Sequence, residues 1–271
     1  MWLRCILPLA LLFQQPTAPV DEPASWIDPD LRVEHFVVYT KRVETGRAPT
    51  VDVVGFVEMR RRDGRTGVQL ECDSRFLVGS LGTDARRSVQ RVLHVESPTD
   101  RGPRCMWREI GPGTGRSVEA EWSRDGNSLE ISEWSAGPKR TGTLIVSSGA
   151  SMPLSLVELL RAGQLTSGSI VVFDPLALTL EPLFVKTVWL DDSEAIGEDP
   201  DVDTASLAAL RTVELVRQDG SLAGRYRFRG RSLVAFQWQE GATFARIVDA
   251  AQFESLLSQH AEPLVKSTQT R

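Results

Sequence analysis

The sequence is poor in the residues that carry chemistry in metal sites and enzymes. Its 271 residues include three cysteines and three histidines, His35, His94 and His260. The histidines stand far apart, and no HxxxH or HExxH pair exists, so no spacing typical of a zinc site is present. We therefore expect no metal centre. Lysine is also scarce: four lysines leave 27 arginines among the 31 basic residues, which indicates the codon bias of a GC-rich, bacterial genome.

The few cysteines leave one disulfide open. Cys5 belongs to an N-terminal segment that we expect to be removed, which leaves Cys72 and Cys105. In an oxidising compartment these two residues can form a bridge. Both lie in stretches typical of strands, so a bridge requires neighbouring strands in register. Two separate buried thiols are the alternative.

Long apolar runs are absent beyond the N-terminus, so we expect no transmembrane span in the mature chain. The N-terminus itself has Arg4 before an apolar run, Cys5–Phe13, and a proline-rich polar stretch after it. This is the order of a secretory signal. We predict a signal peptide over residues 1–20 and export to the periplasm or cell envelope. An uncleaved N-terminal anchor is the alternative.

An excess of positive charge is also lacking. The formal net charge is −5, and the arginines are scattered among acidic residues. Such a chain has no electrostatic reason to bind nucleic acid or an anionic membrane surface. We therefore expect no nucleic-acid partner.

Three motif-like stretches fail at a position that their chemistry requires. Residues 149–153, "GASMP", end in proline where the nucleophile elbow of a serine hydrolase needs a small residue. Residues 111–116, "GPGTGR", lack the lysine of a P-loop. Residues 199–203 have Asp-x-Asp-x-Asp spacing but lack the glycine and glutamate that complete a calcium loop. A looser calcium site at 191–194 is less favoured than a solvated acidic loop. We expect no cofactor and no catalytic residue.

What the sequence does contain is period-two alternation. It runs from residue 30 to residue 147 and returns in several shorter segments near the C-terminus. In "SVEAEWSR", for example, Val118, Ala120 and Trp122 alternate with polar residues. Alternation with polar outward positions is typical of antiparallel sheet that is solvated on one face.

Three Asp-Gly pairs lie between alternating runs: 63–64, 125–126 and 219–220. Aspartate followed by glycine tolerates the positive φ angles of a two-residue type I′ turn. We predict that these pairs are hairpin turns and not catalytic aspartates.

Two segments break the alternation and predict short helices. "SMPLSLVELLRAG" has Pro153 near its start and Gly163 as its stop. Residues 249–260 begin with the capping-box order Asp-x-x-Gln. We predict a mainly β (α+β) fold: a large curved antiparallel sheet or half-barrel with two short helices packed on it. It forms one domain over 28–260, followed by a frayed tail over 261–271.

Seven tryptophans are many for this length, and several lie in strand candidates. We predict that five aromatic residues line an apolar groove on the concave face of the sheet: Trp122, Trp134, Trp189, Phe236 and Trp238. The alternative is that these side chains fill the core between sheet and helices.

The order of elements resembles the LolA/LolB/RseB superfamily and the related exported DUF3108-type proteins. The resemblance lies in the layout across most of the chain, with segments such as "FDPLAL" and "GRYRFRGRSLVAFQW" in the same style. It implies an unclosed β-barrel that holds helices in its concave face, where the better-known members take lipid or acyl chains. No binding residue is carried over.

We therefore expect an exported, non-enzymatic binding or envelope-accessory protein that holds a lipid or other apolar ligand in the concave face. A domain that binds an envelope protein partner is the alternative. An uncharacterised hydrolase is a further one, which requires titratable groups that converge in a cleft. A structure with His35 or His94 beside an acid or a thiol would favour the hydrolase.

Overall fold

The structure is a computed structural model. It describes residues 31–42, 50–78, 87–111, 114–135, 137–146, 150–189, 210–238 and 243–262. The predicted signal peptide, the acidic segment that contains residues 191–203 and the tail beyond residue 262 lie outside these residues.

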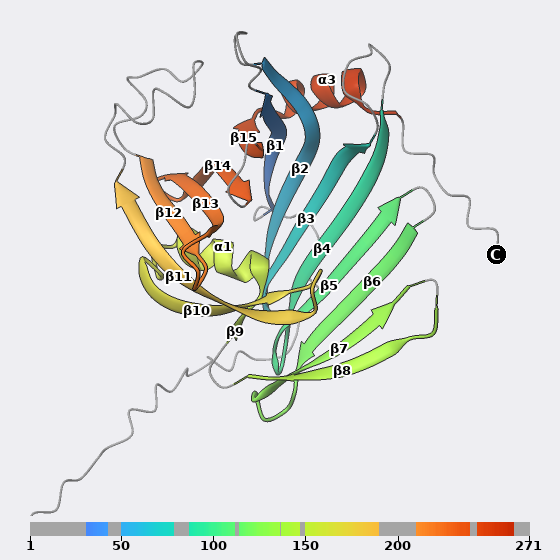
Figure 1. Cartoon of the computed structure of the whole chain (residues 1–271), viewed down its shortest axis with the longest axis vertical. Coiled ribbons are helices and arrows are strands. Elements are labelled where there is room, and N and C mark those ends of the chain that lie inside the picture. The colour runs from blue at the N-terminus through green and yellow to red at the C-terminus, as the bar shows by residue number, and fades with distance from the viewer. Residues whose placement is uncertain are drawn as a thin grey trace, which may run out of the picture.

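Fifteen strands form one curved sheet, and their neighbours are antiparallel except for the parallel pair β9–β10 (Figure 1). This confirms the predicted fold class. The strands are β1 Leu31–Arg42, β2 Thr50–Gly64, β3 Gly67–Val78, β4 Ser88–Thr99, β5 Gly102–Gly111, β6 Thr114–Trp122, β7 Ser128–Trp134, β8 Arg140–Ile145, β9 Ala150–Ser151, β10 Ser167–Asp174, β11 Thr179–Trp189, β12 Leu210–Val216, β13 Leu222–Arg229, β14 Ser232–Trp238 and β15 Thr243–Val248.

The chain builds the sheet in two runs that meet at β1. The strands β1 to β8 follow one another as a meander. After β9 and helix α1 (Pro153–Arg161), the strands β10 to β15 return, and β15 pairs with the free edge of β1. Strand β1 therefore lies in the interior of the sheet, between β2 and β15, and joins the two runs.

Two of the three Asp-Gly pairs form connections between strands, but not as type I′ turns. Gly126 and Gly220 follow β6 and β12 with φ angles of 70° and 84°. Asp125 and Asp219 do not share this conformation, since Leu178 is the one described residue other than glycine with positive φ. Each aspartate instead accepts a hydrogen bond from the backbone N–H two residues on. The glycine alone supplies the left-handed position.

The third pair, 63–64, was predicted wrongly as the turn. Asp63 and Gly64 are the last residues of β2, where Gly64 pairs with Gly67 of β3. The two residues between these glycines, 65–66, make the connection. The turn thus lies two residues further along the chain than expected, and the cross-strand partner of Arg62 changes by four residues, from Arg65 to Gln69.

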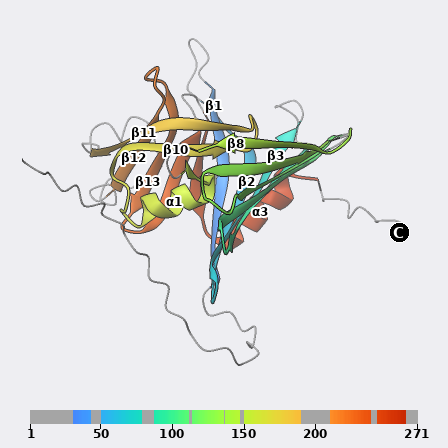
Figure 2. The ribbon, with the colours of Figure 1, turned by 90° about the horizontal axis from the view of Figure 1, so that it is seen from below.

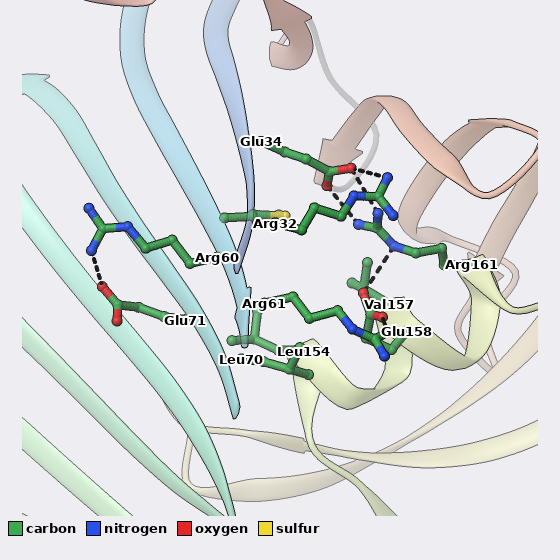
Figure 3. Close-up of a pocket in the computed structure, with 11 residues that line it drawn as sticks. Arg32, Glu34, Arg60, Arg61, Leu70, Glu71, Leu154, Val157, Glu158 and Arg161 are labelled. Carbon is green, nitrogen blue, oxygen red and sulfur yellow. Dashed lines mark hydrogen bonds and ion pairs between the residues drawn. The ribbon is translucent and has the colours of Figure 1, made fainter. Parts of the chain in front are cut away.

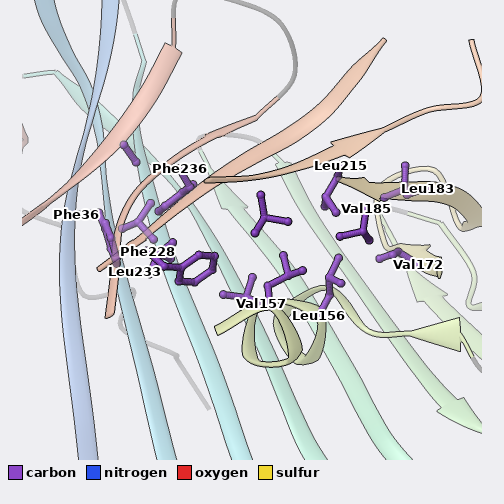
Figure 4. Close-up of a cluster of buried hydrophobic side chains, with 14 of the residues drawn as sticks. Phe36, Leu156, Val157, Val172, Leu183, Val185, Leu215, Phe228, Leu233 and Phe236 are labelled. Atoms are coloured by element: carbon purple, nitrogen blue, oxygen red, sulfur yellow. The ribbon is translucent and has the colours of Figure 1, made fainter. Parts of the chain in front are cut away.

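Strand β1 is buried on both faces at its centre. Phe36 and Val38 point into the concave face, and Val37 points to the convex face; all three are fully buried. The concave core surrounds α1, whose Leu156 and Val157 face the aromatic and branched side chains of the surrounding strands (Figure 4). The sheet thus wraps around α1.

Helix α3 (Ala250–His260) lies on the opposite side of the sheet (Figure 2). Its Phe253 packs against Phe56 and Val37 on the convex face of β1 and β2. Its N-terminus is capped as predicted, because the Asp249 carboxylate accepts a hydrogen bond of 2.8 Å from the Gln252 N–H. Of the helices in the described residues, only α1 therefore lies inside the concavity, whereas the resemblance implied that helices are held there.

The chain stays docked on the sheet for a short distance after α3. The Ala261 position forms a parallel bridge with Arg87, and the Glu262 N–H donates to the Arg87 carbonyl at 2.9 Å. The first two residues of the predicted frayed tail are therefore bonded to the start of β4.

We expect Phe253→Ala to lower the free energy of unfolding by about 3 kcal/mol, because it removes a buried ring from the convex core and leaves a cavity. Phe184→Ala is the matched control, since the Phe184 ring on β11 is half exposed. The control should cost less than about 1 kcal/mol. Urea unfolding measures both, and equal losses would show that α3 is not anchored by this ring.

Candidate functional site: a cavity beside helix α1

The N-terminus of α1 is capped by a strand, because its own cap position offers no side-chain acceptor. Glu96 of β4 is buried and accepts hydrogen bonds from the N–H groups of Leu154 (2.6 Å) and Ser155 (2.7 Å). The Ser155 hydroxyl donates a third bond of 2.6 Å. A carboxylate here satisfies orphan helix donors and complements the helix dipole.

The C-terminus of α1 is held by a buried ion pair. Arg161 donates to Glu34 of β1 through both terminal nitrogens, at 2.8 and 2.7 Å, and both side chains are more than nine-tenths buried. Its Nε also lies 2.9 Å from a carboxylate oxygen of Glu158, which pairs in turn with Arg61 of β2 (Figure 3). Two charged contacts thus tie this end of α1 to β1 and β2.

A polar hollow of about 300 Å³ borders this network. Its arginines include Arg32, Arg61 and Arg161, and each of the three pairs with a carboxylate of the same network. Positive charge is therefore largely neutralised within the protein. We interpret the network as the anchor of α1 and not as a ligand site.

A larger cavity of about 380 Å³ lies on the other side of α1, against the concave face. The register places Met59, Cys72, His94 and Trp107 in one row across β2 to β5, and this row forms part of the wall. Helix α1 closes one side with Leu154 and its neighbours. The remaining wall comes from β13 and β14. The complete lining is Met59, Cys72, Ser74, Phe76, Gln90, Val92, His94, Trp107, Glu109, Pro153, Leu154, Val157, Leu176, Tyr226, Phe236 and Trp238.

Aromatic rings dominate one end of this cavity. Phe236 and Trp238 of β14 meet edge to face with ring centroids 4.6 Å apart. Trp238 reaches Phe76 of β3 across the cavity, with centroids 6.2 Å apart, and Tyr226 stacks against Phe236. Two of the five predicted wall residues, Phe236 and Trp238, therefore line the cavity.

Trp122 and Trp134 do not line it. Trp122 is buried in a second core cluster between β5, β6, β7 and β10. Trp134 lies on β7 with the Lys139 ammonium 4.7 Å from its ring centroid. Trp189 ends β11, and its side chain lies outside the described part of the chain.

Sequence reasoning missed Phe76, Trp107, Tyr226 and His94 as members of one wall. Alternation places each on one face of its own strand, but it does not tell which strands of a curved sheet face each other across its concave side. Only the pairing of β15 with β1 brings β14 opposite β3. The one available signal was the aromatic composition of these strands.

His94 is a histidine of the cavity wall with two polar neighbours. Its Nε2 lies 3.1 Å from a carboxylate oxygen of Glu96 and 3.2 Å from the Cys105 sulfur. Burial disfavours the charged imidazolium, but Cys105 and Glu96 outweigh this effect and raise the pKa of His94 to about 10. We infer that His94 is an imidazolium at neutral pH.

The juxtaposition of His94 with an acid and a thiol is the arrangement that would favour a hydrolase, but its geometry differs from that of a catalytic triad. In a triad one imidazole nitrogen serves the nucleophile and the other serves the acid. Here Glu96 and Cys105 both contact Nε2, and Cys105 is fully buried and is not part of the cavity wall. Within the described residues, no three His, Cys, Asp or Glu side chains are arranged to hold a metal ion.

The disulfide that the sequence left open is not formed. Cys72 on β3 and Cys105 on β5 are free thiols, and β4 lies between their strands. Strands two positions apart are about 9.5 Å from each other, which exceeds the Cα separation that a disulfide allows. Cys72 faces the cavity, where burial raises its pKa to about 11.

Comparisons with known proteins give the chain no family. No family model matches the sequence, and no curated protein matches it. Among solved structures it is similar to a β-barrel-like protein of a domain of unknown function, DUF1849, from Brucella abortus. That match has a TM-score of 0.49 and 13% identity, and covers 80% of this chain and 96% of the other. The LolA-type resemblance therefore stays a prediction. In the described part of the chain no helix is both long and apolar enough to cross a membrane.

We expect Arg161→Met and Glu34→Met each to lower the free energy of unfolding by about 3 kcal/mol, because each takes the two-bonded partner from a buried charge and leaves it one other contact, Arg32 for Glu34 and Glu158 for Arg161. The double variant should lose much less than the sum, because it leaves no orphaned charge. Arg104→Met, which removes an exposed pair with Glu119, is the control and should cost less than about 1 kcal/mol. Additive losses in urea unfolding would contradict the anchoring role.

We expect His94 to make stability depend on pH. Because its pKa is raised from about 6.5 in the unfolded chain, its contribution is complete below about pH 6.5 and is lost as the pH rises toward about 10. Burial also raises the pKa of Cys72 to about 11 and of Tyr226 to about 12, which lowers alkaline stability with or without His94. The wild type should therefore lose stability more steeply above neutral pH than His94→Gln.

Urea unfolding at a series of pH values measures this difference. His35→Gln, a change of the same kind on the convex face, serves as the control and should retain the steeper slope. Parallel curves for the wild type and His94→Gln would show that His94 is not charged in the folded protein.

Proposed function

We propose that this chain is a non-enzymatic binding protein that holds an apolar small molecule or a single lipid chain in the cavity beside α1. Export to the periplasm or cell envelope, which the N-terminal segment predicts, is part of this proposal. Fractionation of the native host tests it, and recovery of the protein from the cytoplasm would contradict it.

The observation that carries the proposal is the aromatic end of the cavity. A volume of about 380 Å³ falls within the range of ordinary small-molecule sites, about 300–1,000 Å³. Phe76, Phe236 and Trp238 face this space from two runs of the sheet, and Trp238 is 36% exposed in spite of its size. Apolar surface left uncovered in a concave site favours an apolar ligand, at about 25 cal/mol per Å² buried.

Helix α1 explains why the space remains open. It fills the concavity next to β10 to β13 through Leu156, Val157 and Leu160. Its N-terminal residues, Pro153 and Leu154, form only a side wall of the cavity. The charged anchors at both ends of α1 prevent it from sliding into this space.

We expect the apolar dye N-phenyl-1-naphthylamine to bind the wild type with increased fluorescence, and Trp238→Ala to weaken this binding about tenfold, because a large aromatic contact is lost. The half-exposed position of Trp238 makes the variant structurally tolerable. Titration of the dye against each purified protein measures the change.

Trp134→Ala is the matched control, because it removes the same ring from β7, outside the cavity lining. It should bind the dye like the wild type. If the wild type binds no dye and native mass spectrometry shows no co-purified molecule, the binding function is wrong. If both tryptophan variants weaken binding equally, the site is not this cavity.

A further inference from the structure

We infer that the ligand of this cavity is an amphipathic acid whose anionic head group accepts a hydrogen bond from His94 Nδ1, with its apolar tail between Phe76 and Trp238. This inference rests on the proposed binding function and specifies the chemical class of its ligand.

His94 uses one of its two ring nitrogens in its contacts with the described residues. The ring lines the cavity, yet both of its polar contacts, to Glu96 and Cys105, are made through Nε2. No described residue makes a hydrogen bond with Nδ1. A protonated imidazole donates from both nitrogens, so Nδ1 carries a donor whose acceptor must come from the cavity.

The carboxylate beside His94 has hydrogen-bond donors of its own. The negative charge of Glu96 is already satisfied by three donors at the start of α1, namely the Leu154 and Ser155 N–H groups and the Ser155 hydroxyl. The positive end of the helix dipole offsets part of this carboxylate charge. The charges of Glu96 and of the His94 imidazolium cancel in sum, but Glu96 is not among the residues that line the cavity, so the member of the pair that faces the cavity is the imidazolium.

The other titratable groups of the described lining do not offer His94 Nδ1 an acceptor. Cys72 lies directly across from His94 on β3 and is a neutral thiol, since burial raises its pKa to about 11. Glu109 bears the one carboxylate among the described lining residues, on β5 beside Val92, and it is bonded to Gln90. It lies one cross-strand row away from His94, toward the aromatic end.

Along β3 the cavity wall changes from a polar end to an aromatic end. Cys72 marks the His94 end, and Phe76, four residues on, marks the aromatic end. At about 3.3 Å per residue these ends are roughly 13 Å apart. A linear molecule with one charged end and an apolar tail of medium length matches this distribution.

The test compares decanoic acid with decanol, two probes that share the tail and differ in the head group. We expect the wild type to bind decanoic acid about tenfold more tightly than decanol at neutral pH, because a charge-assisted hydrogen bond is gained. His94→Gln should lose this preference and bind the two probes with equal affinity. His35→Gln, on the convex face, should keep the preference. Isothermal titration calorimetry measures all six combinations.

The outcomes separate this inference from the binding function. If decanol binds but decanoic acid shows no advantage in the wild type, the acidic head group is wrong and the apolar site stands. If the advantage survives in His94→Gln, the head group lies elsewhere. If neither probe nor the dye binds, the binding function itself is wrong.

A measurement on the wild type covers the case in which His94→Gln does not fold. The protein is labelled with ¹⁵N-histidine and titrated with each probe in an NMR experiment. The Nδ1 resonance of one of the three histidines should shift with decanoic acid and not with decanol. Absence of any histidine shift at saturating decanoic acid would overturn the inference.

Discussion

The structure depends on the charged clamp that holds α1 inside the curved sheet. Nine residues are too few for a helix that is stable by itself, so its position must be imposed by the strands. Glu96 of β4 binds its N-terminal N–H groups, and Glu34 of β1 binds Arg161 at its other end. Breaking such a buried pair leaves an uncompensated charge. The helix therefore has one favourable position in the concavity, and the apolar core forms around it.

The clamp also decides where the sheet stays open. Because α1 is fixed toward β10 to β13, its apolar stripe completes the core on that side. The concave face of β3 to β5 on the other side receives only the helix N-terminus, and a cavity remains. A longer helix would have filled the concavity and left no site. The size of the site is thus a consequence of the short helix and the wide sheet.

The sequence predicted what depends on local pattern. Alternation located the strands, and Pro153, Gly163 and the aspartate cap of α3 located the helices. Alternation could not orient β1, because its centre is buried on both faces and Phe36, Val37 and Val38 are all apolar. The position of α1 could not be predicted either, because it depends on a pair, Glu34 and Arg161, whose members are 127 residues apart in the sequence. The same holds for the cavity, whose walls meet only when β15 closes onto β1. The turn type was wrong because glycine alone adopts the left-handed conformation there.

Glu96 links the position of helix α1 to the charge of His94 in the cavity wall. The same carboxylate that caps α1 also lies 3.1 Å from His94 and favours its imidazolium. Burial disfavours the charge of an imidazolium, and Cys105 and Glu96 together outweigh this effect at His94. A capping serine in the chain before α1 would have anchored the helix equally well, but it would not have placed a carboxylate beside His94. The use of a strand carboxylate in place of a local cap therefore makes structural sense if the charge of His94 is needed in the cavity, as recognition of an acidic ligand requires.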